Sequence, residues 1–153
     1  MTETTASDHS SLHVALICSR FNDLIVDRLE HGARDVLVRA GLDDNNVDSI
    51  WLPGAWEIPQ AAKAAALSGR FDAVIGLGAV IRGATYHFEI VASQSAAGLA
   101  TVALDTGVVV TNGIITVENM EQALDRAGGK SGNKGAEAAA AALDTLAVVS
   151  YLR

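Results

Sequence analysis

One short segment combines a histidine with small residues that leave room for a ligand. It runs from Ile81 to Glu89 and reads IRGATYHFE. Gly83 and Ala84 carry little side chain, so a ligand can approach the backbone there. If a helix begins at this point, its first amides are unpaired and lie at the positive end of the helix dipole, which suits a phosphate group. His87 would then lie in the first helical turn, where the dipole favours a neutral imidazole and hence a general base near pH 7.

The same segment has an ordinary structural interpretation. Thr85 is a good N-cap residue, so the pattern is equally typical of a strand-to-helix turn that a threonine caps. A single histidine such as His87 is more often exposed to solvent without a catalytic role. The segment therefore indicates an anion site only in combination with other residues.

A second segment places an aromatic ring beside a carboxylate. It reads PGAWEIP and spans residues 53–59. Following the small Ala55, Trp56 offers a face on which a flat heterocycle can stack, and Glu57 can accept hydrogen bonds from hydroxyl groups. The alternative is a core tryptophan followed by a carboxylate that favours the start of a helix.

Two smaller groups extend the set of candidates. Phe21 and Asn22 again pair an aromatic ring with a polar side chain after a predicted strand. Arg126, Lys130 and Lys134 form a small basic cluster in an acidic chain. Such a cluster can hold a phosphate, although a solvated face is the usual explanation for it.

The sequence does not contain several common cofactor-binding and catalytic motifs in complete form. Residues 76–78 read GLG, but the third glycine of a dinucleotide fingerprint would fall on Ile81. Residues 129–131 read GKS, but the first glycine of a P-loop would fall on Leu124. The four histidines and the single cysteine have no metal-ligand spacing, and no GxSxG elbow occurs. We therefore expect neither a metal nor a nucleotide cofactor.

The elements that must position these residues alternate along the chain. Apolar runs predict strands, and apolar residues at helical spacing predict helices. The strands are expected at 12–18, 47–52, 73–81 and from 108, and the helices at 26–40, 58–67, 88–103, 120–127 and 138–149. This alternation predicts an α/β protein, a three-layer αβα sandwich around a four-stranded parallel sheet. Ligands gather at the carboxyl ends of such strands, which places the site near Phe21 and residues 53–57, 80–87 and 112–116.

Composition narrows the class of protein. The chain has 153 residues, of which 50% are hydrophobic and 19% charged, which fits one domain at 12–153 behind a disordered tail at 1–11. The net charge of −7 and the few aromatic residues argue against a nucleic-acid partner. No apolar run reaches the ~20 residues of a membrane span. A single cysteine, Cys18, excludes an internal disulfide and suits the cytoplasm.

Taken together, these motifs resemble one family, the lumazine synthases of riboflavin biosynthesis. The matching segments are RFN at 20–22, LPGAWEIP at 52–59, GAVIRGATYHFEIV at 78–91, NGIITVENMEQALDRAG at 112–128 and GNKGAEAA at 132–139. The resemblance implies a flavodoxin-like fold and a transferase without cofactor or metal. Its small-molecule substrates would be a pyrimidine, 5-amino-6-(D-ribitylamino)uracil, and a sugar phosphate, 3,4-dihydroxy-2-butanone 4-phosphate.

The resemblance also implies a role for each candidate residue. The pyrimidine would be bound by Phe21, Asn22, Ala55, Trp56, Glu57, Val80 and Ile81. Within this set, the two aromatic rings hold the heterocycle, and the carboxylate binds the ribityl chain. The phosphate would be bound by Gly83, Ala84, Thr85 and Arg126, with Lys134 as a further contact. His87 would transfer protons.

The resemblance further implies a homo-oligomer. Subunits would form rings of five, with Asn112, Arg126 and Lys134 completing the site of a neighbour. Many members carry an aromatic residue where Asn112 stands, so binding of the pyrimidine is expected to be weaker or to use polar contacts. Some members stop at the pentamer or decamer, and others close sixty subunits into an icosahedral shell. The link GGKSGNKG at 128–135 is similar to that of the shell-forming members. An association with riboflavin synthase is implied as well.

Two alternatives belong to other classes. A flavodoxin-like binding module would hold a flavin or a lumazine tightly without turnover. A structural shell or storage protein would retain the assembly after its pocket had decayed, yet both Arg126 and His87 are present.

Overall fold

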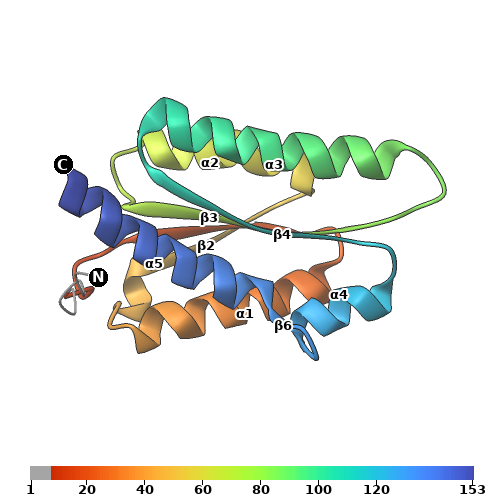
Figure 1. The fold of residues 1–153 in the computed structure, drawn as a ribbon, viewed down its shortest axis with the longest axis horizontal. Coiled ribbons are helices and arrows are strands. Elements are labelled where there is room, and N and C mark those ends of the chain that lie inside the picture. The colour runs from red at the N-terminus through yellow and green to blue at the C-terminus, as the bar shows by residue number, and fades with distance from the viewer. Residues whose placement is uncertain (1–7) are drawn as a thin grey trace.

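A four-stranded parallel sheet lies between two layers of helices in the computed structural model, which describes residues 8–153 (Figure 1). The strand order is β2-β1-β3-β4, and all neighbouring strands are parallel. The strands are β1 (Val14–Ser19), β2 (Val47–Leu52), β3 (Ala73–Ile81) and β4 (Val109–Val117). The predicted three-layer α/β class is confirmed.

Helices cover both faces of the sheet (Figure 1). One layer contains α1 (Asp23–Arg39), the short α4 (Met120–Arg126) and α5 (Lys134–Leu152). The other layer contains α2 (Ile58–Leu67) and α3 (His87–Thr106). Short 3-10 turns lie at Asp44–Asn46 and Ala55–Glu57, and a small hairpin forms from β5 (Ala127–Gly129) and β6 (Gly132–Asn133).

The central strands explain where the core lies. Every residue of β1 is buried, and so is every residue of β3 except Ile81, because helices cover both of their faces. Side chains of β1 alternate between the two faces, so Leu16 packs towards α1 and Ile17 towards α2 and α3. The near-continuous apolar run at 73–81 is therefore the expected sequence of an inner parallel strand.

The predicted elements all occur, but the bounds of only three of them are confirmed. Strands β2 and β3 and helix α2 begin and end where the pattern predicts them. The β5–β6 hairpin is not predicted, because its glycine-rich residues carry no hydrophobic pattern. Of the tail predicted at 1–11, residues 1–7 lie outside the described part. Residues 8–11 lead into a turn in which His9 Nδ1 lies 3.0 Å from Ala40 O.

One helix within residues 8–153 is long and apolar enough to cross a membrane by length and composition alone. This helix is α5, which packs along α1 and against β4. A helix that covers a sheet needs such an apolar composition, so this feature is weak evidence for a membrane.

Candidate functional site

A cavity of about 740 Å³ opens where β1, β2 and β3 end. Its lining is formed by Phe21, Pro53, Gly54, Ala55, Trp56, Glu57, Ala79, Val80, Ile81, Gly83, Thr85, His87, Phe88, Ile90 and Val91. The cavity lies at the carboxyl ends of parallel strands, as the sequence predicts. Most of the predicted site residues meet there, although Asn22, Ala84, Asn112, Arg126 and Lys134 are not part of its lining.

Backbone hydrogen bonds beyond the strands bring the two aromatic segments together. Arg20 N donates to Leu52 O at 2.7 Å, and Phe21 N donates to Pro53 O at 3.0 Å. The turn after β1 is therefore held against the turn after β2, and Phe21 lies beside the segment that carries Trp56. The chain thus assembles two separate aromatic side chains at one wall of the cavity.

These aromatic rings are available to a ligand. Phe21 is 73% exposed and Trp56 is 55% exposed, so the core alternative for Trp56 is wrong. The neighbouring Ala55 is buried and anchors the 3-10 turn that presents Trp56. Glu57 lies close to the backbone of that turn, since a Cβ added to Gly54 would be 3.1 Å from Glu57 Oε2. A flat ring on the aromatic side chains would have this carboxylate within reach.

Asn22 has a structural position beneath the cavity. It occupies the N-cap position of α1, but its backbone is left-handed, with φ 63°, and its side chain makes no capping hydrogen bond within the described residues. Instead, Nδ2 donates to Ala79 O at 3.1 Å. The carboxamide of Asn22 therefore turns away from the helix and holds the end of β3.

The β3–α3 connection differs from the expected capped turn. Helix α3 begins at His87, and its N-cap position is Tyr86, without a side-chain capping bond in the described chain. The expectation that Thr85 caps this helix is wrong, because the N-cap position lies one residue further along, at Tyr86. His87 lies in the first turn, as predicted. Because no side chain caps the helix, its first amides remain available to an anion.

Asn112 lies away from the end of β4. It pairs with Gly76 in the middle of the strand, and its Oδ1 accepts a hydrogen bond from Ile114 N at 2.8 Å. The expectation that residues 112–116 follow β4 is wrong, because β4 stays paired with β3 as far as Val117. Asn112 lines a second hollow of about 470 Å³, beside Tyr86 and Phe88.

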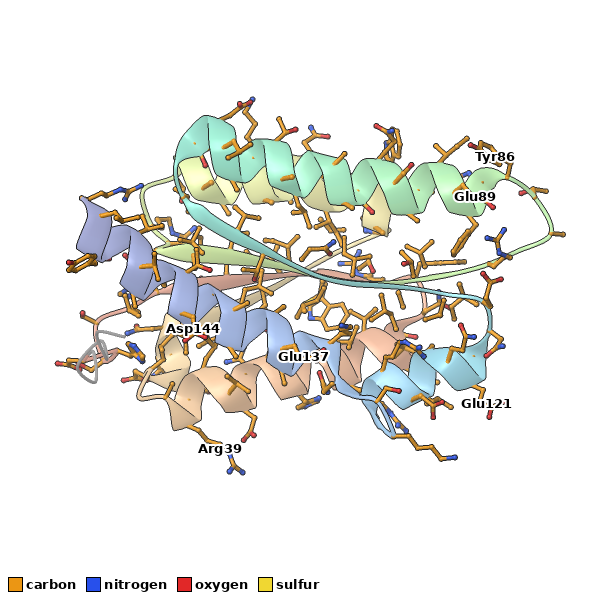
Figure 2. The ribbon with its side chains drawn as sticks, viewed as in Figure 1. Arg39, Tyr86, Glu89, Glu121, Glu137 and Asp144 are labelled. Carbon is orange, nitrogen blue, oxygen red and sulfur yellow. The ribbon has the colours of Figure 1, made fainter. Side chains whose placement is uncertain are left out.

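Arg126 and Lys134 lie in the other helix layer. Arg126 is the last residue of α4 and donates from Nη1 to Gln122 O at 3.1 Å. Lys134 is the first residue of α5, and its Nζ lies 3.3 Å from Glu137 Oε2. Figure 2 shows Glu137 on the opposite side of the sheet from Tyr86 and Glu89. Within one chain, these two cations do not reach the cavity.

Asn133 and Gly135, at the start of α5, attach this helix to α1, a role that the sequence analysis did not predict. Asn133 Oδ1 accepts from Ala136 N at 3.0 Å, which caps α5, while Nδ2 donates to Arg28 O at 3.0 Å, which fastens the helix to α1. Gly135 lies so close to α1 that an added Cβ would be 2.0 Å from Leu29 O. The asparagine and the glycine of GNKG thus set where Lys134 lies.

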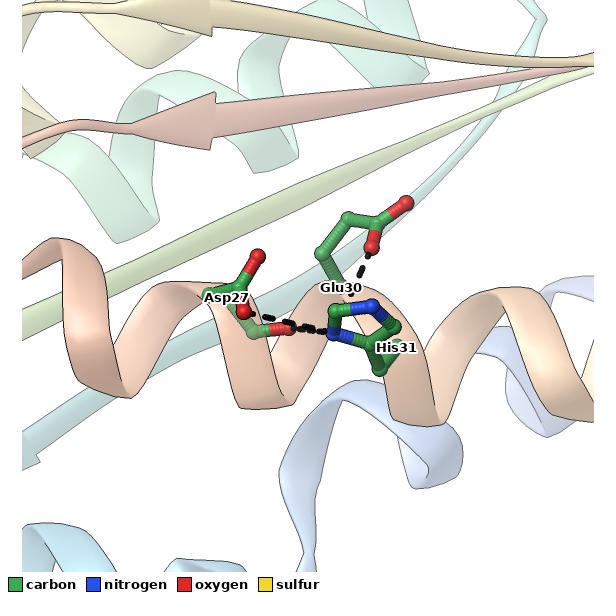
Figure 3. Close-up of side chains that lie close together, drawn as sticks. All are labelled: Asp27, Glu30 and His31. Atoms are coloured by element: carbon green, nitrogen blue, oxygen red, sulfur yellow. Dashed lines mark hydrogen bonds and ion pairs between the residues drawn. The ribbon is translucent and has the colours of Figure 1, made fainter.

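A second group of ionisable side chains lies on α1 (Figure 3). Asp27, Glu30 and His31 have potential ligand atoms within 4.8 Å of one another. His31 Nδ1 lies 2.8 Å from Asp27 O, and Glu30 Oε1 accepts from Arg34 Nε at 2.9 Å and from Ser49 Oγ at 2.7 Å. These atoms already have partners, and the group belongs to the α1 layer rather than to the cavity.

Cys18 is not a nucleophile of this site. Its thiol is buried in β1, and burial, with a smaller contribution from the charge of Glu30, raises its pKa to about 12. The thiol stays protonated at neutral pH, and the reactive form of cysteine is the thiolate.

Comparison with known proteins identifies the family. The family model described as 6,7-dimethyl-8-ribityllumazine synthase matches residues 11–150. A protein of that name from Nitratidesulfovibrio vulgaris (strain DP4) is 51% identical over 145 residues, which cover 95% of this chain and 93% of the relative. Another from Edwardsiella ictaluri (strain 93-146) is 52% identical over 141 residues, which cover 92% and 90% of the two chains. The cavity motifs and the matched length lead to one conclusion: the chain belongs to the 6,7-dimethyl-8-ribityllumazine synthase family.

Proposed function

We propose that this chain condenses 5-amino-6-(D-ribitylamino)uracil with 3,4-dihydroxy-2-butanone 4-phosphate to form 6,7-dimethyl-8-ribityllumazine, the penultimate step of riboflavin biosynthesis. One observation carries the proposal. A single cavity brings together exposed aromatic rings, a carboxylate, an uncapped helix start and His87. Membership of the family supplies the identity of the substrates.

The reaction needs orientation and proton transfer more than a cofactor. The amine of the pyrimidine attacks the ketone, and loss of water gives an imine. Phosphate is then eliminated with its bonding electron pair, and a second loss of water closes the ring. Holding two substrates in the correct geometry supplies much of the rate of such a reaction.

The cavity suggests how the pyrimidine is bound. Phe21 and Trp56 lie where they can hold the heterocycle, and Glu57 lies where it can accept hydrogen bonds from ribityl hydroxyls. Backbone groups of Val80 and Ile81, at the end of β3, would bond the edge of the uracil. Asn22 acts below this wall by holding Ala79.

The anion-binding half uses the β3–α3 connection. Amides of Gly83, Ala84 and Thr85, together with the first turn of α3, would hold the phosphate. His87 would receive and return protons beside it. Arg126 would supply a cation from a neighbouring subunit, because in its own chain it lies across the sheet from the cavity.

Assembly of subunits is part of the proposal. Large apolar side chains lie exposed on several helices, such as Leu24, which is 80% exposed, and Leu104, which is 86% exposed. We propose rings of five in which Asn112, Arg126 and Lys134 complete the neighbour's site, and further closure of twelve rings into a shell. Riboflavin synthase, the consumer of the product, is a proposed partner. A cytoplasmic location is proposed because the chain has one cysteine, which is free and buried.

Turnover by the purified protein tests the proposed reaction. Mixing the two substrates should produce the fluorescent lumazine faster than the uncatalysed condensation, without added metal or cofactor. A flavodoxin-like binding module would instead bind the product tightly and leave the background rate unchanged. That result would overturn the proposed activity.

Replacing His87 tests its role in proton transfer. We expect His87→Ala to lower kcat by about tenfold or more, since general acid–base catalysis contributes at least this factor. The exposed position of the side chain means that the fold should stay intact. Steady-state kinetics between pH 6 and 8 measure the effect, and a kcat equal to that of the unchanged protein across this range would remove His87 from the mechanism.

Light scattering tests the assembly. A ring of five 15.8 kDa chains has a mass of about 79 kDa, and a closed shell of sixty has a mass of about 950 kDa. We expect the larger particle. A mass near 79 kDa at all micromolar concentrations would contradict the shell, and a fully active 15.8 kDa monomer would contradict the shared site.

A further inference from the structure

Arg82 is the last residue before the connection that we assign to phosphate binding. We infer that its side chain is a positioning residue, which clamps this connection and the first turn of α3 in the geometry that the reaction needs. The inference rests on the proposed function for its kinetic consequence. Its structural basis is independent of that function and is described first.

The connection has few other attachments. In the part of the chain that the structure describes, Gly83, Ala84 and Thr85 make no hydrogen bond to the rest of the protein. Before them, Arg82 N donates to Val117 O at 2.9 Å. After them, Tyr86 O accepts bonds from the first turn of α3. Three exposed residues are thus held only at their two ends.

The side chain of Arg82 joins these two ends. Its Nη1 donates to Glu89 Oε1 in the first turn of α3, and its Nε forms an ion pair with Glu118 Oε2, 2.6 Å away and just after β4. The guanidinium carbon lies 4.5 Å from the centroid of the Phe88 ring, within the range of a cation–π contact. One planar side chain therefore fixes the helix start relative to the sheet, and a single exposed ion pair would do so far less well.

Glu89 depends on this arginine. Its Oε2 is shielded from solvent and has no hydrogen-bond partner among residues 8–153, so Arg82 supplies the compensation for its charge. The hydrogen bond from Arg82 also lowers the pKa of Glu89, which keeps the carboxylate ionised at neutral pH. The stabilisation from this pair is present above the ordinary pKa and is lost as the pH falls through the lowered one. Without Arg82, the carboxylate must turn towards water and move the helical turn that carries His87.

The same contacts argue against Arg82 as a direct phosphate ligand. Its Nε and Nη1 are occupied by two carboxylates, whose combined negative charge exceeds the charge of the guanidinium. An anion would meet a net repulsion there, whereas the free amides of Gly83 to Thr85 carry no such charge.

The test compares Arg82→Gln, Glu89→Gln and the double variant with a matched control. Arg70→Gln is the control. Arg70 also pairs with a carboxylate, that of Asp48, and its guanidinium carbon lies 5.0 Å from the centroid of the Phe71 ring. It precedes β3, however, and therefore does not belong to the β3–α3 connection. Hydrogen exchange of the peptide that contains residues 83–90 measures the clamp without reference to activity. Two-substrate kinetics measure its consequence.

We expect hydrogen exchange in this peptide to be faster in Arg82→Gln and Glu89→Gln than in the unchanged protein. In Arg70→Gln the exchange rate should not change. The value of kcat/KM for the butanone phosphate should fall roughly tenfold in Arg82→Gln, because small misplacements of reacting groups are costly. Glu89→Gln should cause a smaller fall in the same direction, since Glu118 still holds the arginine. The double variant should be no worse than Arg82→Gln, and the KM for the pyrimidine should change by less than about twofold.

Two results would overturn the inference. If Glu89→Gln lowered the KM for the butanone phosphate, the freed Arg82 would be a direct phosphate ligand. If exchange in the peptide stayed unchanged in both variants, the clamp would not exist. Absence of lumazine formation by the unchanged protein would instead overturn the proposed function, and the exchange measurement would still decide the clamp.

Discussion

We expect Arg126→Ala to raise the KM for 3,4-dihydroxy-2-butanone 4-phosphate by about ten- to a hundredfold, because a charge-assisted hydrogen bond contributes roughly 1.5–3 kcal/mol. The guanidinium donates to Gln122 O and has no carboxylate partner among the described residues, so its charge is available. Lys134, by contrast, is already paired with Glu137. The KM for the pyrimidine should change little.

Arg39→Ala is a suitable control for this variant. Arg39 also lies in the last turn of a helix, α1, but pairs with Asp35 at 3.0 Å and belongs to no proposed site (Figure 2). Steady-state kinetics with each substrate varied in turn measure both variants. Equal effects of Arg126→Ala on the two KM values would show that Arg126 is not the phosphate ligand.

We expect Gly135→Ala to lower the free energy of unfolding by about 3 kcal/mol, at the upper end of the usual cost of overpacking. The added Cβ would lie 2.0 Å from Leu29 O and 2.7 Å from Leu29 C, and backbone atoms of a helix cannot turn aside as a flexible side chain can. Helix α5 would have to move away from α1. A loss of this size should lower Tm by roughly 6–12 °C for a chain of this length.

Gly83→Ala is the matched comparison for stability. The same methyl group meets no atom within 4 Å among the described residues at Gly83, so Tm should stay nearly unchanged. Thermal unfolding of both variants at one protein concentration makes the comparison, since assembly links Tm to concentration. A Gly135→Ala variant as stable as Gly83→Ala would show that α5 can shift at little cost.

The sequence predicts the layers of this protein well and its local contacts less well. The run at 73–81 is predictable because a strand buried on both faces needs continuous apolar residues, and the alternation of elements then dictates a parallel sheet. The place of the cavity follows from the same rule, because carboxyl ends of parallel strands meet at one edge. The hydrophobic periodicity of the sequence therefore predicts the type and order of the helices and strands.

Features that depend on contacts between different helices and strands could not be predicted from the sequence. Helix α3 starts at His87 with Tyr86 at its N-cap position, although Thr85 is the better capping residue. The position of Asn112 depends on how far β4 stays paired with β3. The clamp of Arg82 includes Glu118, which lies on another element, and no sequence pattern indicates that the two residues meet. Likewise, no pattern within one chain brings Arg126 to the cavity.

The docking of α5 on α1 has a consequence for how the chain folds as it is made. The hydrogen bond from Asn133 to Arg28 joins positions 105 residues apart. At a synthesis rate of about 5–20 residues per second, α1 waits roughly 5–20 seconds for the helix that packs along it. During that interval, the nascent chain exposes a surface that chaperones recognise and that promotes aggregation. The synthesis of α5 thus ends this vulnerable period.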